Sequence, residues 1–259
     1  MSERVDPVGR FSGRVDDYVR GRPGYPSGLF DGVAELAALA PGSCVADVGA
    51  GTGISSAPFL ERGFEVIAVE PDGEMRAAAA TRLGSDPRFR LVAGRAEASG
   101  LDAASVDLVF AAQAFHWFDA ALAREEFRRI LRPGGAVALV WNARRAEGTC
   151  FARAYERLLL EFGTDYRQVG HRGVGRERLE AFFGGPFETR RFDNAQSLDL
   201  DALRARLLSS SYVPAAGEPR HAEMLAELER IFAEHAERGA VRLDYDCDLF
   251  VGGLPSADG

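Results

Sequence analysis

The sequence predicts one α/β domain built on a doubly wound, mostly parallel sheet. From residue 43 onward, short runs rich in β-branched residues alternate with longer helical stretches, as in successive βαβ units. A glycine-rich turn directly follows the first of these runs, where open α/β sheets bind their ligands. The chain has 259 residues, of which 46% are hydrophobic, so it can bury a full core.

The first part of the chain carries the regular alternation. Strands are expected over residues 44–48, 64–69, 89–92, 106–111 and 136–141, and helices over 54–62, 74–83 and 119–131. Asp72 is placed to cap the second of these helices. The run 106–111 is apolar except for Asp107, as expected for a central parallel strand covered on both faces. Pro133 ends the third helix because proline cannot continue one.

After Asn142 the alternation is lost. Here the sequence predicts a helix over 148–162, a glycine-rich stretch over 163–185, a strand over 187–192, helices over 200–208 and 219–238, and a last strand over 241–251. Residues 1–40 are interpreted as an N-terminal helical cap, 41–145 as a binding core, 146–240 as lid helices with the sixth strand, and 241–259 as the last strand and tail. Such additions usually set the choice of substrate.

Composition excludes several classes of partner. The formal net charge of −8, from 31 basic and 39 acidic residues, argues against nucleic acid as the main partner. The three cysteines form no close pair, so no metal site or disulfide framework is expected. No apolar run approaches the roughly 20 residues that span a bilayer. We therefore expect a soluble cytoplasmic monomer or homodimer without a membrane partner.

The strongest functional signal is the turn Asp47-Val-Gly49-Ala-Gly51-Thr-Gly53. Its glycines allow the backbone to turn tightly and approach a ligand closely. Dinucleotide sites prefer a further glycine at the position that Ile54 occupies here, and the chain lacks a Tyr-x-x-x-Lys pair, so a nicotinamide-dependent oxidoreductase is disfavoured.

Glu70 ends the second strand about twenty residues further on, where an acid accepts hydrogen bonds from ribose hydroxyls. The alternative is a tight turn followed by a solvated glutamate.

Together these motifs resemble those of the class I S-adenosylmethionine (SAM)-dependent methyltransferases, within the small-molecule group of trans-aconitate-methyltransferase-like proteins. The segments that carry the resemblance are 47–53, Val69-Glu70-Pro71, Gly94-Arg95-Ala96-Glu97, the strand exit 106–118, Leu131-Arg-Pro-Gly-Gly135, and, outside the core, 18–26 and 209–214. The resemblance covers nearly the whole chain. It implies a Rossmann-like seven-stranded sheet with an antiparallel last strand and a helical lid.

The same resemblance implies a set of SAM-binding residues. Asp47 is expected near the ammonium group, and the following turn along the methionine part. Tyr18 and Arg22 have the spacing of one helix face and are expected to close over the SAM carboxylate; an ordinary exposed helix is the alternative. Many relatives have aspartate at the position of Arg95, which has no acceptor. The full predicted set is Tyr18, Arg22, Asp47, Gly49, Ala50, Gly51, Glu70, Pro71, Ala96, Glu97 and Gln113.

The acceptor side is predicted from the segments that follow the fourth strand. His116 is the one of four histidines that a motif places near the site, and it is the candidate general base; a wall residue is the alternative. Tyr25, Trp117, Ser211 and Tyr212 are the candidate substrate-binding residues, with core packing or helix capping as alternatives. The predicted function is methyl transfer from SAM to an oxygen of a small molecule. Carbon or nitrogen acceptors, and a non-catalytic SAM-binding protein, stay open.

Overall fold

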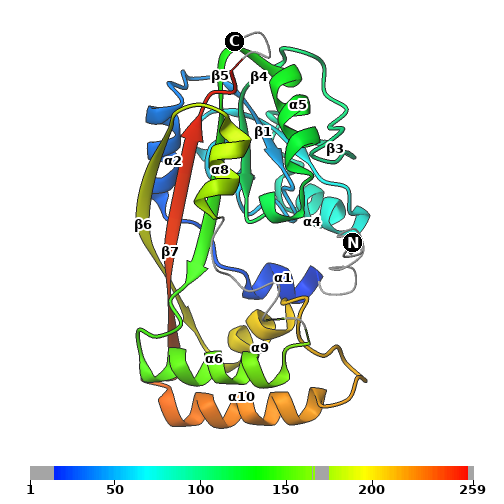
Figure 1. Cartoon of the computed structure of the whole chain (residues 1–259). Coiled ribbons are helices and arrows are strands. Elements are labelled where there is room, and N and C mark those ends of the chain that lie inside the picture. Colours follow the sequence, from blue (N-terminus) through cyan, green and yellow to red (C-terminus); the bar gives the residue numbers. More distant parts are fainter. Residues whose placement is uncertain (1–14, 165, 167–174, 256–259) are drawn as a thin grey trace.

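A seven-stranded sheet organises the chain (Figure 1). The computed structural model describes residues 15–164, 166 and 175–255. Residues 1–14 of the predicted cap, most of 165–174 in the glycine-rich stretch, and 256–259 of the tail lie outside this part. The strand order is β3-β2-β1-β4-β5-β7-β6, and β7 runs antiparallel to both of its neighbours. The prediction of a doubly wound, mostly parallel sheet with an antiparallel last strand is therefore confirmed.

The strands are β1 (Cys44–Val48), β2 (Glu65–Val69), β3 (Phe89–Val92), β4 (Val106–Ala112), β5 (Leu131–Arg144), β6 (Phe187–Leu198) and β7 (Val241–Gly252). The helices are α1 (Val15–Gly21), α2 (Ser27–Leu36), α3 (Ser56–Glu61), α4 (Gly73–Leu83), α5 (Ala120–Ile130), α6 (Cys150–Phe162), α8 (Arg176–Phe183), α9 (Leu200–Leu208) and α10 (His221–His235), with a short 3-10 helix η1 (Phe115–Trp117). Asp72 caps α4 as predicted, accepting hydrogen bonds from the amides of Glu74 and Met75.

Two hydrophobic cores lie on the two faces of the sheet. Helices α2 and α3 pack on one face, where Phe30, Phe59 and Phe110 meet edge to face. Helices α5 and α8 pack on the other, where Phe127 and Phe182 lie over the strands. Alternate strand residues point to opposite faces, so each strand of the centre is buried on both sides. This three-layer arrangement leaves the carboxyl ends of the parallel strands as the open edge.

A third core forms a separate helical cap beyond that edge (Figure 1). Helices α6, α9 and α10 enclose it, together with the far ends of β6 and β7. Helix α1 lies between the cap and the sheet, and it packs closely on α9. At their contact Gly21 has no room for a side chain, because an added Cβ would lie 2.3 Å from the backbone nitrogen of Arg206. The edge of the sheet at the carboxyl ends of its parallel strands is thus covered by helix α1 and the cap.

Three elements differ from the sequence prediction. Helix α8 lies inside the stretch expected to be glycine-rich and irregular, and its Leu179, Phe182 and Phe183 pack into the core. Strand β6 continues to Leu198, past the predicted end at 192, because it pairs with β7 along its whole length. Strand β5 spans 131–144 instead of 136–141, with a register shift opposite Val106 and Leu108. Within the described ranges, no helix is long and apolar enough to cross a membrane.

Candidate functional site

A cavity of about 1090 Å³ lies at the carboxyl ends of the strands, beneath the cap. The predicted residues in its wall are Tyr18, Arg22, Gly49, Gly51, Glu70, Pro71, Ala96, Glu97, Gln113, His116, Trp117, Ser211 and Tyr212. Ala50 and Tyr25 line a smaller adjoining cavity. Asp47 lines neither of these two cavities and lies fully buried behind the glycine turn. The fold therefore brings together, around two neighbouring cavities with shared wall residues, almost all residues that the sequence singled out.

The glycine turn after β1 lies against the segment that follows β4. The amide of Gly49 donates to the carbonyl of Val69 at 2.8 Å, which ties the turn to the end of β2. Gly49 has φ +72°, and an added Cβ would lie 2.6 Å from the Cβ of Ala114. Both the backbone conformation and the close approach require glycine here. The backbone of the turn consequently forms part of the cavity wall itself.

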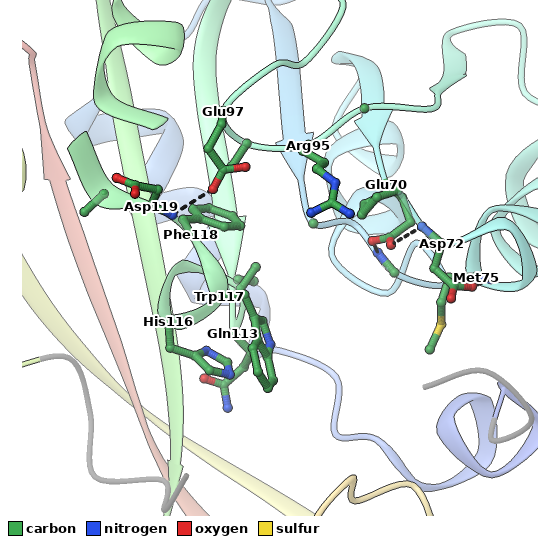
Figure 2. Close-up of a pocket in the computed structure, with 18 of the residues that line it drawn as sticks. Glu70, Asp72, Met75, Arg95, Glu97, Gln113, His116, Trp117, Phe118 and Asp119 are labelled. Carbon is green, nitrogen blue, oxygen red and sulfur yellow. Dashed lines mark hydrogen bonds between the residues drawn. The ribbon is translucent and has the colours of Figure 1, made fainter. Parts of the chain in front are cut away.

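Glu70 is held in place by backbone amides on both of its carboxylate oxygens. Oε2 accepts from Gly51 N at 2.9 Å, and Oε1 accepts from Asp72 N at 2.9 Å (Figure 2). The side chain is only 8% exposed, and this burial raises its pKa, while the two amides oppose the rise. A carboxylate oxygen has a second lone pair, so each can still accept a hydrogen bond from a ligand hydroxyl. Glu70 is thus an oriented acceptor facing the cavity.

The opposite wall is formed by the loop after β3 and the segment that leads into α5. Glu97 Oε1 accepts from the amide of Asp119 at 2.7 Å, and Asp119 in turn caps α5 (Figure 2). The side chain of Glu97 therefore braces the loop as well as lining the cavity. Ala96 is buried beside it, while Figure 2 shows Arg95 on the side of Glu70 and Asp72.

His116 stands in an aromatic wall. Its ring centroid lies 4.4 Å from that of Trp117 and 5.0 Å from that of Trp141, the second in an edge-on arrangement. Arg178 of α8 donates to the carbonyls of Phe115 at 3.1 Å and Phe118 at 3.3 Å, on either side of this turn. These contacts fix the backbone that carries His116. Sequence reasoning missed Arg178, although Leu179, Phe182 and Phe183 have the spacing of a helix face.

Gln113 leaves β4 in a left-handed conformation, with φ +53°. Its Nε2 donates to the carbonyl of Asn142 at 3.0 Å, which sets the orientation of the side-chain amide. Its Oε1 is buried and has no hydrogen-bond partner in the described part of the chain. A buried acceptor of this kind is usually paired with a donor, so Gln113 is suited to receive one from a ligand or a water molecule.

Asp47 underlies the glycine turn with its carboxylate fully buried. Oδ2 accepts from the hydroxyls of Ser55 at 2.7 Å and Ser56 at 2.6 Å. Burial raises the pKa of Asp47 to about 6, although the two hydroxyls lower it. Within the described residues Oδ1 has no partner. Asp47 is thus a buried acid with one oxygen left over, next to the loop that lines the site.

Arg22 connects the N-terminal segment to the cap. Its Nη2 donates to the carbonyl of Ser209 at 2.7 Å, and its guanidinium lies 4.7 Å from the ring centroid of Tyr18. Helix α1 ends one residue earlier, at Gly21, but the amide of Arg22 still bonds the carbonyl of Tyr18. The two side chains therefore share one face, as their spacing predicted. Two side-chain amides of β6 also contact this segment: Asn194 donates a hydrogen bond to the carbonyl of Gly24, and Gln196 donates one to the carbonyl of Gly21.

Strand order, the open carboxyl edge and the oriented acid after β2 together define a doubly wound protein of the nucleoside-binding class. Residues 46–139 match a family model described as a methyltransferase domain. An uncharacterized methyltransferase-like protein of Schizosaccharomyces pombe is 31% identical over 235 residues, which are 89% of this chain and 88% of that protein. The chain belongs to the class I SAM-dependent methyltransferase family.

Further relatives and solved structures agree with this family. An uncharacterized methyltransferase of Mycobacterium tuberculosis is 44% identical over 134 residues, which are 52% of this chain and 52% of that protein, so the chain spans about half the length of such relatives. A structure from Anaeromyxobacter dehalogenans, provisionally assigned as a type II methyltransferase, superposes with a TM-score of 0.64 at 28% identity, covering 90% of this chain and 98% of that one.

A more distant structure shares the fold alone. A phosphoethanolamine N-methyltransferase of Haemonchus contortus, solved with phosphomonomethylethanolamine and S-adenosylhomocysteine, has a TM-score of 0.55 at 14% identity. The alignment covers 93% of this chain and 57% of that one.

Proposed function

We propose that this chain transfers a methyl group from SAM to an oxygen atom of a small-molecule acceptor. The observation that carries the proposal is the carboxylate of Glu70, oriented by two backbone amides on the wall of the main cavity. Such an acid at the end of β2 suits the two hydroxyls of a ribose. Family membership supports SAM, rather than a dinucleotide, as the molecule that carries this ribose.

The size of the main cavity supports a second molecule beside SAM. Small-molecule sites usually measure about 300–1,000 Å³, and this cavity of about 1090 Å³ is slightly larger than that range. With a ribose at Glu70, the remaining space extends towards His116, Trp117 and Trp141, which all lie in the same wall. We assign this aromatic end to the acceptor.

His116 supplies the chemistry that an oxygen acceptor needs. SAM, when bound, supplies a methyl group on a sulfonium. An imidazole nitrogen of His116 accepts the proton of the acceptor hydroxyl or carboxyl group, so that the oxygen can form its new bond to carbon. Trp117 and Trp141 orient the imidazole, and their π faces suit a neighbouring positive charge. The cap and α1 exclude water and hold the acceptor in line, which accounts for much of the catalysis in such displacements.

Two measurements test the proposal. Calorimetry of the purified chain with SAM and with NAD should give binding of SAM alone, because the site has an oriented ribose acceptor but lacks the glycine spacing of a dinucleotide site. Binding of NAD without SAM would refute it. A screen of hydroxy acids, phenols, carboxylic acids and amines, read by release of S-adenosylhomocysteine, should select an oxygen acceptor. Turnover of amines alone would replace the oxygen assignment with nitrogen.

A further inference from the structure

An arginine of α8 holds the turn that carries His116. Arg178 donates through Nη2 to the carbonyls of Phe115 at 3.1 Å and Phe118 at 3.3 Å. Its guanidinium also lies 4.8 Å from the ring centroid of Phe115, and that ring centroid is 4.8 Å from the ring of Phe182, on the same helix. The two carbonyls lie on either side of His116, so a single guanidinium nitrogen holds both ends of the turn.

An arginine of α4 holds the segment that carries Glu70 in the same way. Arg76 donates through Nη1 to the carbonyls of Glu70 at 2.8 Å and Pro71 at 2.7 Å. Burial raises the pKa of the Glu70 carboxyl, and the charge of Arg76 opposes this rise. Hydrogen bonds from a charged donor are stronger than neutral ones, so they restrict where the segment can lie. Arg76 therefore acts on both the backbone position and the charge of Glu70.

The turn that carries His116 depends on contacts from outside for its position. It is a 3-10 helix of only three residues, and the hydrogen bonds of such a helix have poorer geometry than those of an α-helix. Methyl transfer depends on close alignment of the acceptor with the methyl group, and a displacement of about 1 Å can cost about a hundredfold in rate. A contact that sets the position of this turn therefore also sets the rate of transfer.

We propose that Arg178 and Arg76 are positioning residues for two different parts of the reaction. Arg178 sets the position of His116 and thereby the rate of methyl transfer, whereas Arg76 sets the position of Glu70 and thereby the affinity for SAM. The inference rests on the proposed function for the roles of His116 and Glu70. Because the two arginines hold different segments of the cavity wall, the loss of one should affect one quantity and leave the other nearly unchanged.

Methionine variants test this separation, because methionine keeps an unbranched apolar side chain and removes the charge. With the acceptor that the screen selects, Arg178→Met should lower kcat about tenfold to a hundredfold, and calorimetry should find the SAM affinity nearly unchanged. Arg76→Met should weaken SAM binding about threefold to tenfold, as for a lost hydrogen bond, with little change in kcat at saturating SAM. The matched controls are Arg176→Met and Arg82→Met, at exposed positions of the same two helices. Neither control should change kcat or SAM affinity.

A double-mutant cycle measures whether Arg178 acts through His116. In the His116→Ala background, Arg178→Met should have no further effect on kcat, because the side chain that it positions is gone. Arg178→Lys should recover part of the rate, since a lysine ammonium also donates hydrogen bonds to carbonyls. An additive loss of kcat in the double variant, or equal losses of kcat and SAM affinity in Arg178→Met, would assign Arg178 a merely structural role and overturn its part of the inference. Unchanged SAM affinity in Arg76→Met would overturn the other part.

Amide hydrogen exchange, measured by NMR without any ligand, tests the positioning independently of the proposed function. Exchange reports local opening of the backbone. Arg178→Met should accelerate exchange at Trp117 and Phe118, whose amides close the turn. Arg76→Met should accelerate it at the two amides that bond the carboxylate of Glu70. If the unaltered chain binds no SAM, the proposed function fails by itself, and these rates still decide the inference. Rates equal to those of the control variants would overturn it.

Discussion

The two ends of the main cavity differ in how their buried polar groups are satisfied. At the Glu70 end, each carboxylate oxygen accepts a backbone amide, and Asp72 caps α4. At the other end, which includes Arg22, Gln113 and the aromatic wall, Arg22 Nε, Gln113 Oε1 and Trp141 Nε1 have no hydrogen-bond partner in the described part of the chain. Buried polar groups are normally paired. The first end is therefore paired without a ligand, whereas the second end leaves polar atoms that a ligand or water molecule can pair with.

The difference follows from how far apart the contributing segments lie in the sequence. Glu70 and the amide of Gly51 are 19 residues apart and sit on neighbouring parallel strands. Arg22 and the carbonyl of Ser209 are separated by 187 residues and join the N-terminal segment to the cap. A local βαβ unit can orient its own acid, whereas the end assembled from distant segments keeps polar atoms without a partner in the described part of the chain.

His116→Ala is expected to have the largest effect and to act only at the acceptor end. Loss of a general base should reduce kcat by about 10²- to 10⁴-fold, while calorimetry should find the SAM affinity nearly unchanged. His221→Ala, at the start of α10 in the cap, is the matched control. Full turnover in His116→Ala would mean that His116 only lines the cavity and does not act as a general base.

Glu70→Gln should disrupt the hydrogen bonds at the Glu70 end of the main cavity, where the polar groups are paired without a ligand. Glutamine can accept at only one of the two positions where the carboxylate accepts amides, and it carries no charge. SAM binding measured by calorimetry should weaken by about 1–3 kcal/mol, the usual cost of losing a charged hydrogen-bond partner. Glu65→Gln, at the exposed start of β2, should bind SAM as the unaltered chain does. Equal affinity in both variants would take Glu70 out of the site.

Asp47→Asn tests the comparison through the pH dependence of stability, because Asp47 lies beneath the end of the main cavity whose polar atoms have no hydrogen-bond partner in the described part of the chain. Its folded-state pKa of about 6 is above the ordinary value of 3.8, so the folded chain binds this proton more tightly than the unfolded chain. The stability that this proton provides is therefore lost as the pH rises from about 4 to about 6. At pH 7.5 the substitution should raise the free energy of unfolding by about 3 kcal/mol.

At pH 4 the same substitution should have little effect, because Asp47 is then protonated in the folded chain. Urea denaturation of both proteins without ligand, at the two pH values, measures the difference. An equal gain at pH 4 and pH 7.5 would mean that the carboxylate is not strained by its burial.

Much of the core and most of the site could be predicted from the sequence. The first five strands and Glu70 follow from local patterns, because each βαβ unit carries its own hydrophobic period and its own turn. Helix α8 was missed since the glycines around it outweighed three apolar residues with helical spacing. Arg178 was missed for another reason. Its hydrogen bonds to the carbonyls of Phe115 and Phe118 join segments about 60 residues apart along the chain, which no local pattern indicates.

Strand β7 belongs to two hydrophobic cores at once. Its Val241, Leu243 and Tyr245 pack in the cap core, and its Cys247, Leu249 and Val251 belong to the core on the sheet face that α2 covers. Neither core can lose this strand without exposing apolar surface of the other. The cap and the sheet should therefore melt as one cooperative unit, with a single transition in calorimetry. Excision of the cap helices alone would leave three apolar side chains of β7 in water, so the roof of the site cannot be exchanged as an independent module.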